Sequence, residues 1–480
     1  MNMILPDVNL SSLLPELILL AGATLLLFIR GGDNRQGIVP VAVLSVVAAL
    51  AAVCYLWDQG TSGFDGLIVK DNGALLFQGM ILTTALITLV LSRDFLPALK
   101  DAGEYYSLLL FSLIGMGIMT STQDLLVIFL VMEILSLSLY VLVGFMKVIR
   151  TGMEAAMKYF LLGSFSSALF LLGLALYYGA SGTTSLAALA APTSAPTLML
   201  AAFALIMVGL GFKIAAVPFH MWAPDVYEGA PVCVAALISV APKIAVFAVL
   251  LRFGTAMAGP GQSLIWTVVL FMSLAGMVIG NFTALRQSGV ARMLAYSGIA
   301  QVGYMLIGLL AIPKGGASAI AFYLAVYILM NMGAFASLTH LSRRQQETLR
   351  IDDLKGLSSR QPWHAFALAV FMISLAGIPP TGGFFAKFYL FKIGIEAGYL
   401  GVVLIALVAT IVSFFYYLRV VMVMYMAGEG EEALPPLRRG VSLIGVMIAA
   451  IVLMTLLAGI LPDPFIRGVT NVFPAFSSGI

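Results

Sequence analysis

Four charged side chains stand inside long apolar runs: Glu133, Lys213, Lys243 and Lys387. A charged side chain at the centre of a membrane helix costs about 2.5 to 3.5 kcal/mol, so four isolated ones would cost on the order of 10 kcal/mol. Structural ion pairs alone do not account for them, because one acid cannot pair with three lysines. A lysine whose proton affinity changes with burial and with its distance from a carboxylate can load and release protons. The imbalance therefore predicts a proton path.

The chain that positions these groups has 480 residues, of which 61% are hydrophobic and 10% are charged. Its apolar runs of about 20 residues, the length that crosses a bilayer, begin near residues 12, 38, 73, 105, 125, 157, 197, 230, 262, 291, 318, 363, 400 and 440. These runs predict an all-α polytopic membrane protein with about 14 transmembrane helices. The first run, LPELILLAGATLLLFI, lacks a preceding basic stretch and a clear cleavage site, so we expect it to be retained as a span.

Two of the apolar runs are interrupted by proline and glycine. The first interruption follows Lys213 and contains Pro218, and the second is AGIPPTGGFFAKFYLFK, just before Lys387. Paired interruptions of this kind indicate two repeats of inverted topology with an ion site near the breaks. We expect five-helix units near 105–255 and 262–426. A three-helix segment at 1–104 precedes them, and a fourteenth helix with a tail at 427–480 follows.

The basic residues of the loops predict the orientation of the chain. Assigning the loops alternately to two sides gives one side Arg30, Arg35, Arg93, Lys100, Lys147, Arg150, Arg286, Arg292, Arg343, Arg344, Arg350, Lys355, Arg360, Arg438 and Arg439. The other side receives Lys70, Arg252, Lys314 and Arg467. Both termini are therefore predicted on the outer side. There is no basic arm or mixed aromatic and basic patch, so nucleic acid is not an expected partner.

Several polar residues near helix ends are secondary candidates. His220, Asp225 and Glu228 follow the first interruption and can form a proton entrance, since histidine titrates near neutral pH. For Asp225 and Glu228 the alternative is capping of a turn at the membrane edge. Lys158 lies close enough to a helix end to reach water. Glu16, near the outer end of the first span, is expected to be solvated or bonded to a neighbour.

The residue types exclude redox chemistry on this chain. Its two cysteines, Cys54 and Cys233, are too few for an iron–sulfur cluster. Its three histidines, which include His340 and His364, are too few for a haem or metal site. No glycine-rich nucleotide fingerprint follows a strand. We therefore expect no cofactor, no metal and no NADH site here.

Four stretches carry a resemblance to a known family: EAAMKYFLLGSFSSALFLLG, VPFHMWAPDVYEGAP, ARMLAYSGIAQVGYMLIGL and GIPPTGGFFAKFYLF. They resemble the antiporter-like N subunit of the bacterial proton-pumping NADH:quinone oxidoreductase, complex I, whose mitochondrial counterpart is NADH dehydrogenase subunit 2. The resemblance runs from about residue 105 to 426. It implies two inverted five-helix repeats with discontinuous helices 7 and 12, and a translocase subunit in the bacterial inner membrane whose termini face the periplasm.

The same resemblance implies partners and cofactors. Flavin, iron–sulfur clusters and quinone are expected in partner subunits. The expected neighbours are the M-type antiporter-like subunit and the small K-type, J-type and A-type subunits, within the lipid bilayer. Two alternatives stay open: a subunit of a multi-subunit sodium/proton antiporter, and a membrane scaffold that conducts no protons.

Roles for individual residues follow from the resemblance. It matches Glu133 to the family's fifth-helix glutamate, Lys213, Lys243 and Lys387 to its lysines on helices 7, 8 and 12, and Lys158 to a further lysine. The implied path starts with Glu133 close to Lys213, passes to Lys243 and Lys387, and ends outside. A neighbouring subunit must set its direction, because nothing in this chain extracts energy from a redox reaction.

The sequence departs from the family pattern in two places. Gln301 stands where many relatives have histidine, and VCV at 232–234 replaces the usual Thr-Pro-Val. The first departure removes a titratable group from the tenth helix. A proton route there would need water held by Ser297, Gln301 or Tyr304. The second leaves Lys243 intact.

Overall fold

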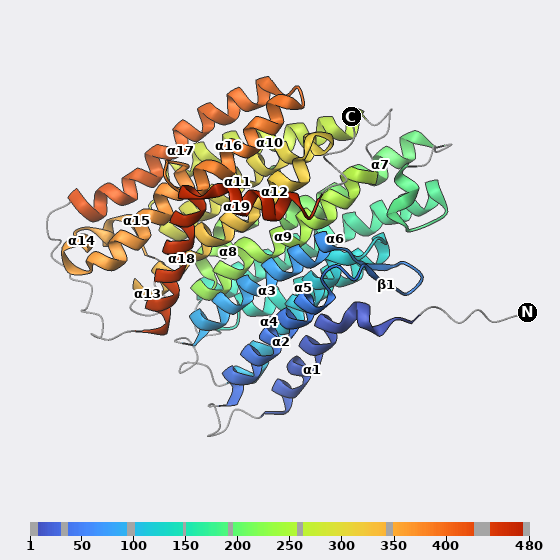
Figure 1. Ribbon diagram of the computed structural model, residues 1–480, viewed down its shortest axis with the longest axis horizontal. Coiled ribbons are helices and arrows are strands. Elements are labelled where there is room, and N and C mark those ends of the chain that lie inside the picture. The colour runs from blue at the N-terminus through green and yellow to red at the C-terminus, as the bar shows by residue number, and fades with distance from the viewer. Residues whose placement is uncertain are drawn as a thin grey trace, which may run out of the picture. The chain divides into compact units, whose positions relative to one another are not determined.

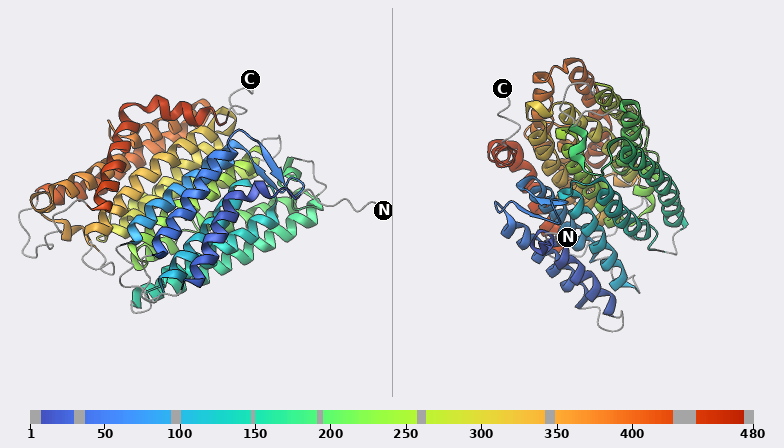
Figure 2. Two further views of the ribbon diagram at one scale, coloured as in Figure 1. Left: turned by 60° about the horizontal axis from the view of Figure 1, so that its bottom comes forward. Right: turned by 90° about the vertical axis from the view of Figure 1, so that its right-hand side faces the viewer.

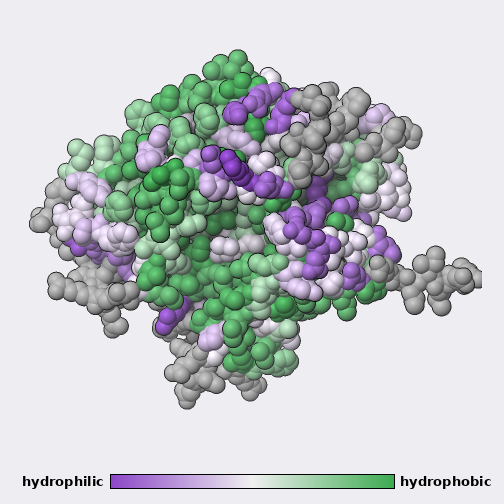
Figure 3. Space-filling model, in the orientation of Figure 1, coloured by the Kyte–Doolittle hydropathy of each residue, from purple (hydrophilic) through white to green (hydrophobic). Residues whose placement is uncertain are grey.

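The computed structural model describes residues 8–29, 37–93, 101–146, 150–190, 195–256, 263–341, 349–426 and 442–473. This part of the chain is almost entirely helical, as predicted (Figure 1). It contains 13 helices that are long and apolar enough to cross a membrane. The surface drawn in Figure 3 is hydrophobic over much of its helical area, as contact with lipid requires. Basic loop residues at 30–36, 94–100, 147–149, 342–348 and 427–441 lie outside the described residues.

The first of two compact units comprises Met1–Phe145, Tyr159–Lys213 and Ala241–Ile265. Its elements are η1 (Leu10–Leu13), α1 (Leu14–Phe28), α2 (Ile38–Leu56), β1 (Thr61–Gly63), β2 (Ile68–Lys70), α3 (Asn72–Ser92), α4 (Ala102–Ser121), α5 (Leu125–Val143), most of α6 (Arg150–Ser181), η4 (Leu186–Ala190), α7 (Pro196–Lys213) and the second part of α9 (Val232–Ala256). Helix α1 packs against α2 and α4, and α4 packs against α5. Figure 2 shows the first helices, in blue, side by side with the β-hairpin at one end.

Local sequence signals explain where these helices begin. Asp71 accepts a hydrogen bond from the amide of Ala74 at 2.7 Å and starts α3. Asp124 accepts from the amides of Leu126 and Val127 at 2.9 and 3.0 Å and starts α5. Aspartate is a preferred N-cap because its carboxylate satisfies amides that lack a helical partner. The short antiparallel hairpin before α3 pairs Thr61 with Lys70 and was not among the predicted elements.

The second unit comprises Met146–Lys158, Ile214–Val240 and Trp266–Ile480. Its elements are α8 (Trp222–Gly229), most of α10 (Ser263–Ala284), α11 (Val290–Leu310), η5 (Ile312–Lys314), α12 (Gly316–Tyr327), η6 (Ile328–Met332), α13 (Gly333–Leu341), η7 (Ile351–Leu354), α14 (Leu357–Arg360), α15 (Pro362–Ala376), α16 (Gly382–Glu396), α17 (Leu400–Met426), α18 (Leu443–Ile460) and α19 (Pro462–Thr470). Helix α11 packs against α8 and α12, and α15 packs against α17.

Both predicted interruptions are present. Helix α7 ends at Lys213 and α8 begins only at Trp222, and Ala215 between them has a left-handed φ of 56°. Helix α15 ends before Gly377, whose φ is 85°, and α16 begins at Gly382. The span predicted near residue 363 is therefore two shorter helices. Glycine fits this turn because a side chain is disfavoured at positive φ.

A third irregularity has no breaker in the sequence. Helices α12 and α13 are joined by a π-helical turn, η6, which contains Asn331. The Asn331 amide donates to the hydroxyl of Ser239 at 2.6 Å, and both side chains are buried. Such π-turns often occur at functional sites. This one accompanies the buried contact between Asn331 and Ser239.

Candidate functional site

Lys213 is the last residue of α7, and its side chain is 3% exposed. Its ammonium donates to the hydroxyls of Ser136 at 2.6 Å and Tyr140 at 3.3 Å. Both acceptors belong to α5, where a spacing of four residues places them on one face. The nitrogen also lies 5.4 Å from the centre of the Tyr140 ring, within the range of a cation–π contact. Neutral oxygens and an aromatic ring thus surround a buried cation.

Glu133 stands on the same helix, one turn before Ser136. Its carboxylate accepts a hydrogen bond from Ser167 of α6 at 2.5 Å. It lies close enough to act on Lys213 by Coulomb attraction, although no salt bridge joins the two within the described residues. Glu133 therefore attracts the Lys213 ammonium through space, and the helix that carries Glu133 also supplies the hydroxyls that bind this ammonium.

Lys243 lies in α9, which is more fully buried than the other candidate spans of the described residues. Its side chain is 1% exposed, and the most apolar stretch of α9 is 100% buried. Pro242 precedes it within the helix, and a proline there removes one backbone hydrogen bond. The lysine is thus a titratable group shielded from bulk solvent.

Lys387 occupies the second interruption. Its ammonium donates to the backbone carbonyls of Leu375 at 3.0 Å and Ala376 at 2.9 Å, the last two residues of α15. The end of a helix leaves its final carbonyls without intrahelical partners and carries partial negative charge. The nitrogen also lies 5.2 Å from the centre of the Tyr304 ring. The break therefore creates the acceptors that hold this buried cation.

Gln301 joins the surroundings of Lys387 to a buried set of hydroxyl groups. Its amide donates to the carbonyl of Leu375 at 3.4 Å and to the hydroxyl of Tyr417 at 3.3 Å. Its own oxygen accepts from Tyr323, and Ser297 bonds Tyr417. Leu375 is thus shared by Gln301 and Lys387. The Gln301 side chain thus uses both its amide nitrogen and its oxygen in buried hydrogen bonds.

Asn281 of α10 adds two hydrogen bonds to this buried set of hydroxyl groups. Asn281 donates to the hydroxyl of Tyr304 at 3.0 Å and accepts from Tyr416 at 2.9 Å. All three side chains are buried. Tyr304, one of the residues predicted to hold water, therefore bonds an asparagine and faces Lys387 with its ring.

Lys158 belongs to a cluster of ion pairs. Its ammonium lies 2.8 Å from Glu154 and 2.8 Å from Asp225 of α8. Arg292 of α11 binds the same Asp225 at 2.7 Å and Glu228 at 2.9 Å. The lysine side chain is 45% exposed, in keeping with its predicted place near a helix end.

His220, Asp225 and Glu228, which follow the first interruption, do not share one set of contacts. Asp225 and Glu228 bind cations, whereas the Nδ1 atom of His220 has no hydrogen-bond partner among the described residues. Helix α8 lies outside the helices that can span the membrane. Burial raises the pKa of Asp225, but the hydrogen bonds from Lys158 and Arg292 outweigh it and hold this pKa below its ordinary value. Asp225 thus acts as an ionised anchor for α8.

The sequence did not predict one buried cluster, which contains Glu16, Lys70 and Gln78. Lys70, which is predicted from the sequence to lie in a loop on the outer side, is fully buried and donates hydrogen bonds to Glu16 and Gln78. It was missed because it ends a short strand in a polar connection, where charge predicts exposure. The available signal was the apolar run Leu67 to Val69 just before it.

Metal ligands do not gather in the part of the chain that the structure covers. No group of three or more His, Cys, Asp or Glu side chains is placed to hold an ion there. Cys54 is exposed and Cys233 is buried, and no disulfide joins them. His340 and His364 stack with their ring centres 4.4 Å apart.

Comparisons with known proteins agree with this architecture. The family described as "NADH:quinone oxidoreductase/Mrp antiporter, TM" matches residues 122–413. The chain is 40% identical to NADH-quinone oxidoreductase subunit N 1 of Solibacter usitatus over 467 residues, which cover 94% of each chain.

Two solved structures share the fold. A chain of respiratory complex I from Thermus thermophilus with bound aureothin superposes with a TM-score of 0.82 at 34% identity, over 95% of this chain and 99% of that one. A chain of the Mrp complex from Dietzia sp. DQ12-45-1b gives a TM-score of 0.78 at 22% identity, over 98% and 97% of the two chains. The second likeness concerns the fold alone.

Proposed function

The chain belongs to the family of NADH-quinone oxidoreductase subunit N, the antiporter-like membrane subunit of respiratory complex I, and we propose that Glu133, Lys213, Lys243 and Lys387 carry protons through it. The subunit is a multi-pass membrane protein of an enzyme complex. Quinone reduction in other subunits would drive the proton movement. Lys158 and His220 would have secondary roles in this proton path.

One observation carries the proposal: buried lysines are held by neutral oxygens. Lys213 bonds two hydroxyls and Lys387 bonds two carbonyls. A hydroxyl can accept from an ammonium or donate to a neutral amine, so the Lys213 site suits both protonation states. Carbonyls only accept, so the Lys387 site favours the ammonium. The two sites thus differ in how they can hold a neutral amine.

We propose the following order of events. Attraction by Glu133 keeps Lys213 protonated, and separation of the two lowers its affinity for the proton. The proton passes to Lys243, then to Lys387, and leaves on the outer side. A neutral lysine is the acceptor at each step. Direction would come from a neighbouring subunit.

The setting of the subunit is part of the same proposal. Units near 105–255 and 262–426 would be inverted repeats, between a three-helix segment at 1–104 and a C-terminal helix and tail at 427–480. The subunit would lie in the bacterial inner membrane with both termini in the periplasm. Its neighbours would be the M-type, K-type, J-type and A-type subunits, and flavin, iron–sulfur clusters and quinone would reside in partner subunits.

The test uses complex I that carries the variant subunit, reconstituted into liposomes. Lys213→Ala, Lys243→Ala and Lys387→Ala should each lower the number of protons moved per NADH oxidised. Lys392→Ala is the matched control, because Lys392 lies on the same helix as Lys387 and its side chain is 58% exposed. Full proton stoichiometry in Lys213→Ala would refute the path. Transport that depends on sodium would indicate antiporter chemistry instead.

A further inference from the structure

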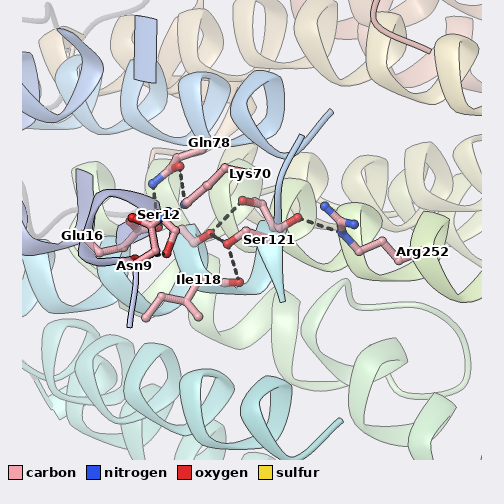
Figure 4. A network of polar contacts seen from close by, with 10 residues as sticks. Asn9, Ser12, Glu16, Lys70, Gln78, Ile118, Ser121 and Arg252 are labelled. Carbon is pink, nitrogen blue, oxygen red and sulfur yellow. Dashed lines mark hydrogen bonds and ion pairs between the residues drawn. The ribbon is translucent and has the colours of Figure 1, made fainter. Parts of the chain in front are cut away.

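Glu16 and Lys70 form a buried ion pair outside the proposed lysine path. The Lys70 nitrogen lies 2.6 Å from Glu16 Oε1, and the two side chains are 0% and 4% exposed. Gln78 completes a triangle: its oxygen accepts from Lys70 at 2.8 Å, and its amide donates to Glu16 Oε1 at 2.9 Å. Figure 4 shows the three side chains pointing toward one another from α1, β2 and α3.

The two oxygens of the Glu16 carboxylate are unequal. Oε1 receives both hydrogen bonds, whereas Oε2 is buried and receives none from the described residues. A buried ion pair that served only stability would gain most from satisfying every oxygen, because an unsatisfied buried polar atom costs about 1 to 3 kcal/mol. The bare oxygen is therefore a place where a proton can bind.

The neighbouring helix leaves room for this arrangement. A Cβ on Gly117 of α4 would lie 2.9 Å from the Gln78 nitrogen and 3.0 Å from Glu16 Oε1. Asp71, next to Lys70, binds Arg252 at 2.9 Å. Arg252 belongs to α9, the helix that carries Lys243. The residue next to Lys70 in the sequence is thus bound to α9, the helix that carries Lys243.

We propose that Glu16, Lys70 and Gln78 form a second proton-exchange site, with Oε2 of Glu16 as the atom that takes up the proton. The inference rests on the proposed function, because it assumes that the subunit carries protons. Nothing in the family resemblance assigns these residues a role.

The exchange balances in three steps. A proton binds Oε2 and neutralises Glu16. Lys70, now a buried ammonium without a counter-charge, releases its own proton to a water molecule. The carboxyl group of Glu16 then turns so that its protonated oxygen faces the neutral Lys70 amine, and transfer of this proton to the amine restores the ion pair. One proton enters and one leaves in each cycle. Gln78 holds Lys70 in place while the Glu16 charge is absent.

The experiment compares complex I carrying Glu16→Gln with complex I carrying Glu16→Gln and Lys70→Met together. The double variant removes both charges and keeps similar volume, so it should assemble. It should reduce quinone yet move about one proton fewer per NADH oxidised, since one site exchanges one proton per cycle. The matched control replaces the exposed pair Lys392 and Glu396 by Met and Gln, and should keep full stoichiometry.

Each contrary result has a clear meaning. Full stoichiometry in the assembled double variant would overturn the site, as would its failure to assemble, because either outcome leaves the ion pair a structural role only. Failure here would leave the lysine path intact. The lysine variants described above test that path separately.

Discussion

Gly163 of α6 lies against the hydroxyl of Tyr140: a Cβ added to the glycine would stand 1.9 Å from that oxygen. The same hydroxyl accepts a hydrogen bond from Lys213 at 3.3 Å. Because Gly163 has no side chain, the Tyr140 hydroxyl has the space that it needs to accept the hydrogen bond from Lys213.

Gly163→Ala should push the Tyr140 ring aside and weaken its bond to Lys213. We expect proton translocation to fall by roughly fivefold, the effect of losing about 1 kcal/mol of hydrogen bonding. Gly179→Ala on the same helix is the control, because a Cβ there would meet nothing within 4 Å. Proton uptake into proteoliposomes measures both variants. Equal rates would mean that the Tyr140 contact is dispensable.

Ser136→Ala should remove the shorter of the two hydrogen bonds to Lys213, at 2.6 Å. A hydrogen bond to a charged group contributes about 1.5 to 3 kcal/mol, so the protonated lysine should become less stable and the proton-pumping rate should fall about tenfold. Ser138→Ala is the control, since Ser138 donates only to the carbonyl of Ile134 among its described contacts. Matching pumping rates in the two variants would contradict the role of Ser136.

Gly377→Ala should disturb Lys387 in two ways. The position has a φ of 85°, and an added Cβ would lie 2.9 Å from Cδ and 3.3 Å from the nitrogen of Lys387. Gly398→Ala shares the backbone cost of about 1 to 2 kcal/mol, with a φ of 88° and no atom within 4 Å. Only Gly377→Ala should reduce proton translocation per NADH oxidised. A comparable loss in both variants would assign the effect to backbone strain.

Gln301→Leu should break the hydrogen bonds to Tyr417 and to the carbonyl of Leu375, and leave Tyr323 without its acceptor. Buried polar groups without partners cost about 1 to 3 kcal/mol each, so both pumping and the thermal stability of the complex should fall. Gln301→His, which keeps a polar side chain able to donate and accept hydrogen bonds, should keep pumping. Gln287→Leu is the control, because that amide donates only to Thr283 among its described contacts. Normal pumping in Gln301→Leu would exclude a relay through this residue.

The sequence by itself determined the membrane class, the span positions and the two interruptions. These follow from local properties: apolar runs of sufficient length must be helical in lipid, and the consecutive prolines Pro379 and Pro380 break a helix. It also singled out Glu133, Lys213, Lys243 and Lys387, because a charge in an apolar run is visible without knowing its neighbours.

Only the tertiary structure decided which atoms hold those charges. Lys213 binds a hydroxyl of α5 that is 73 residues away in the sequence. Lys387 binds a carbonyl at the end of α15 that is 11 residues away. The π-turn at Asn331 and the buried pair of Glu16 and Lys70 also depend on such contacts. Lys70 lies in a polar connection, where composition predicts exposure, and packing of α1 and α3 buries it. Burial is a property of the assembled helices, so no local pattern determines it.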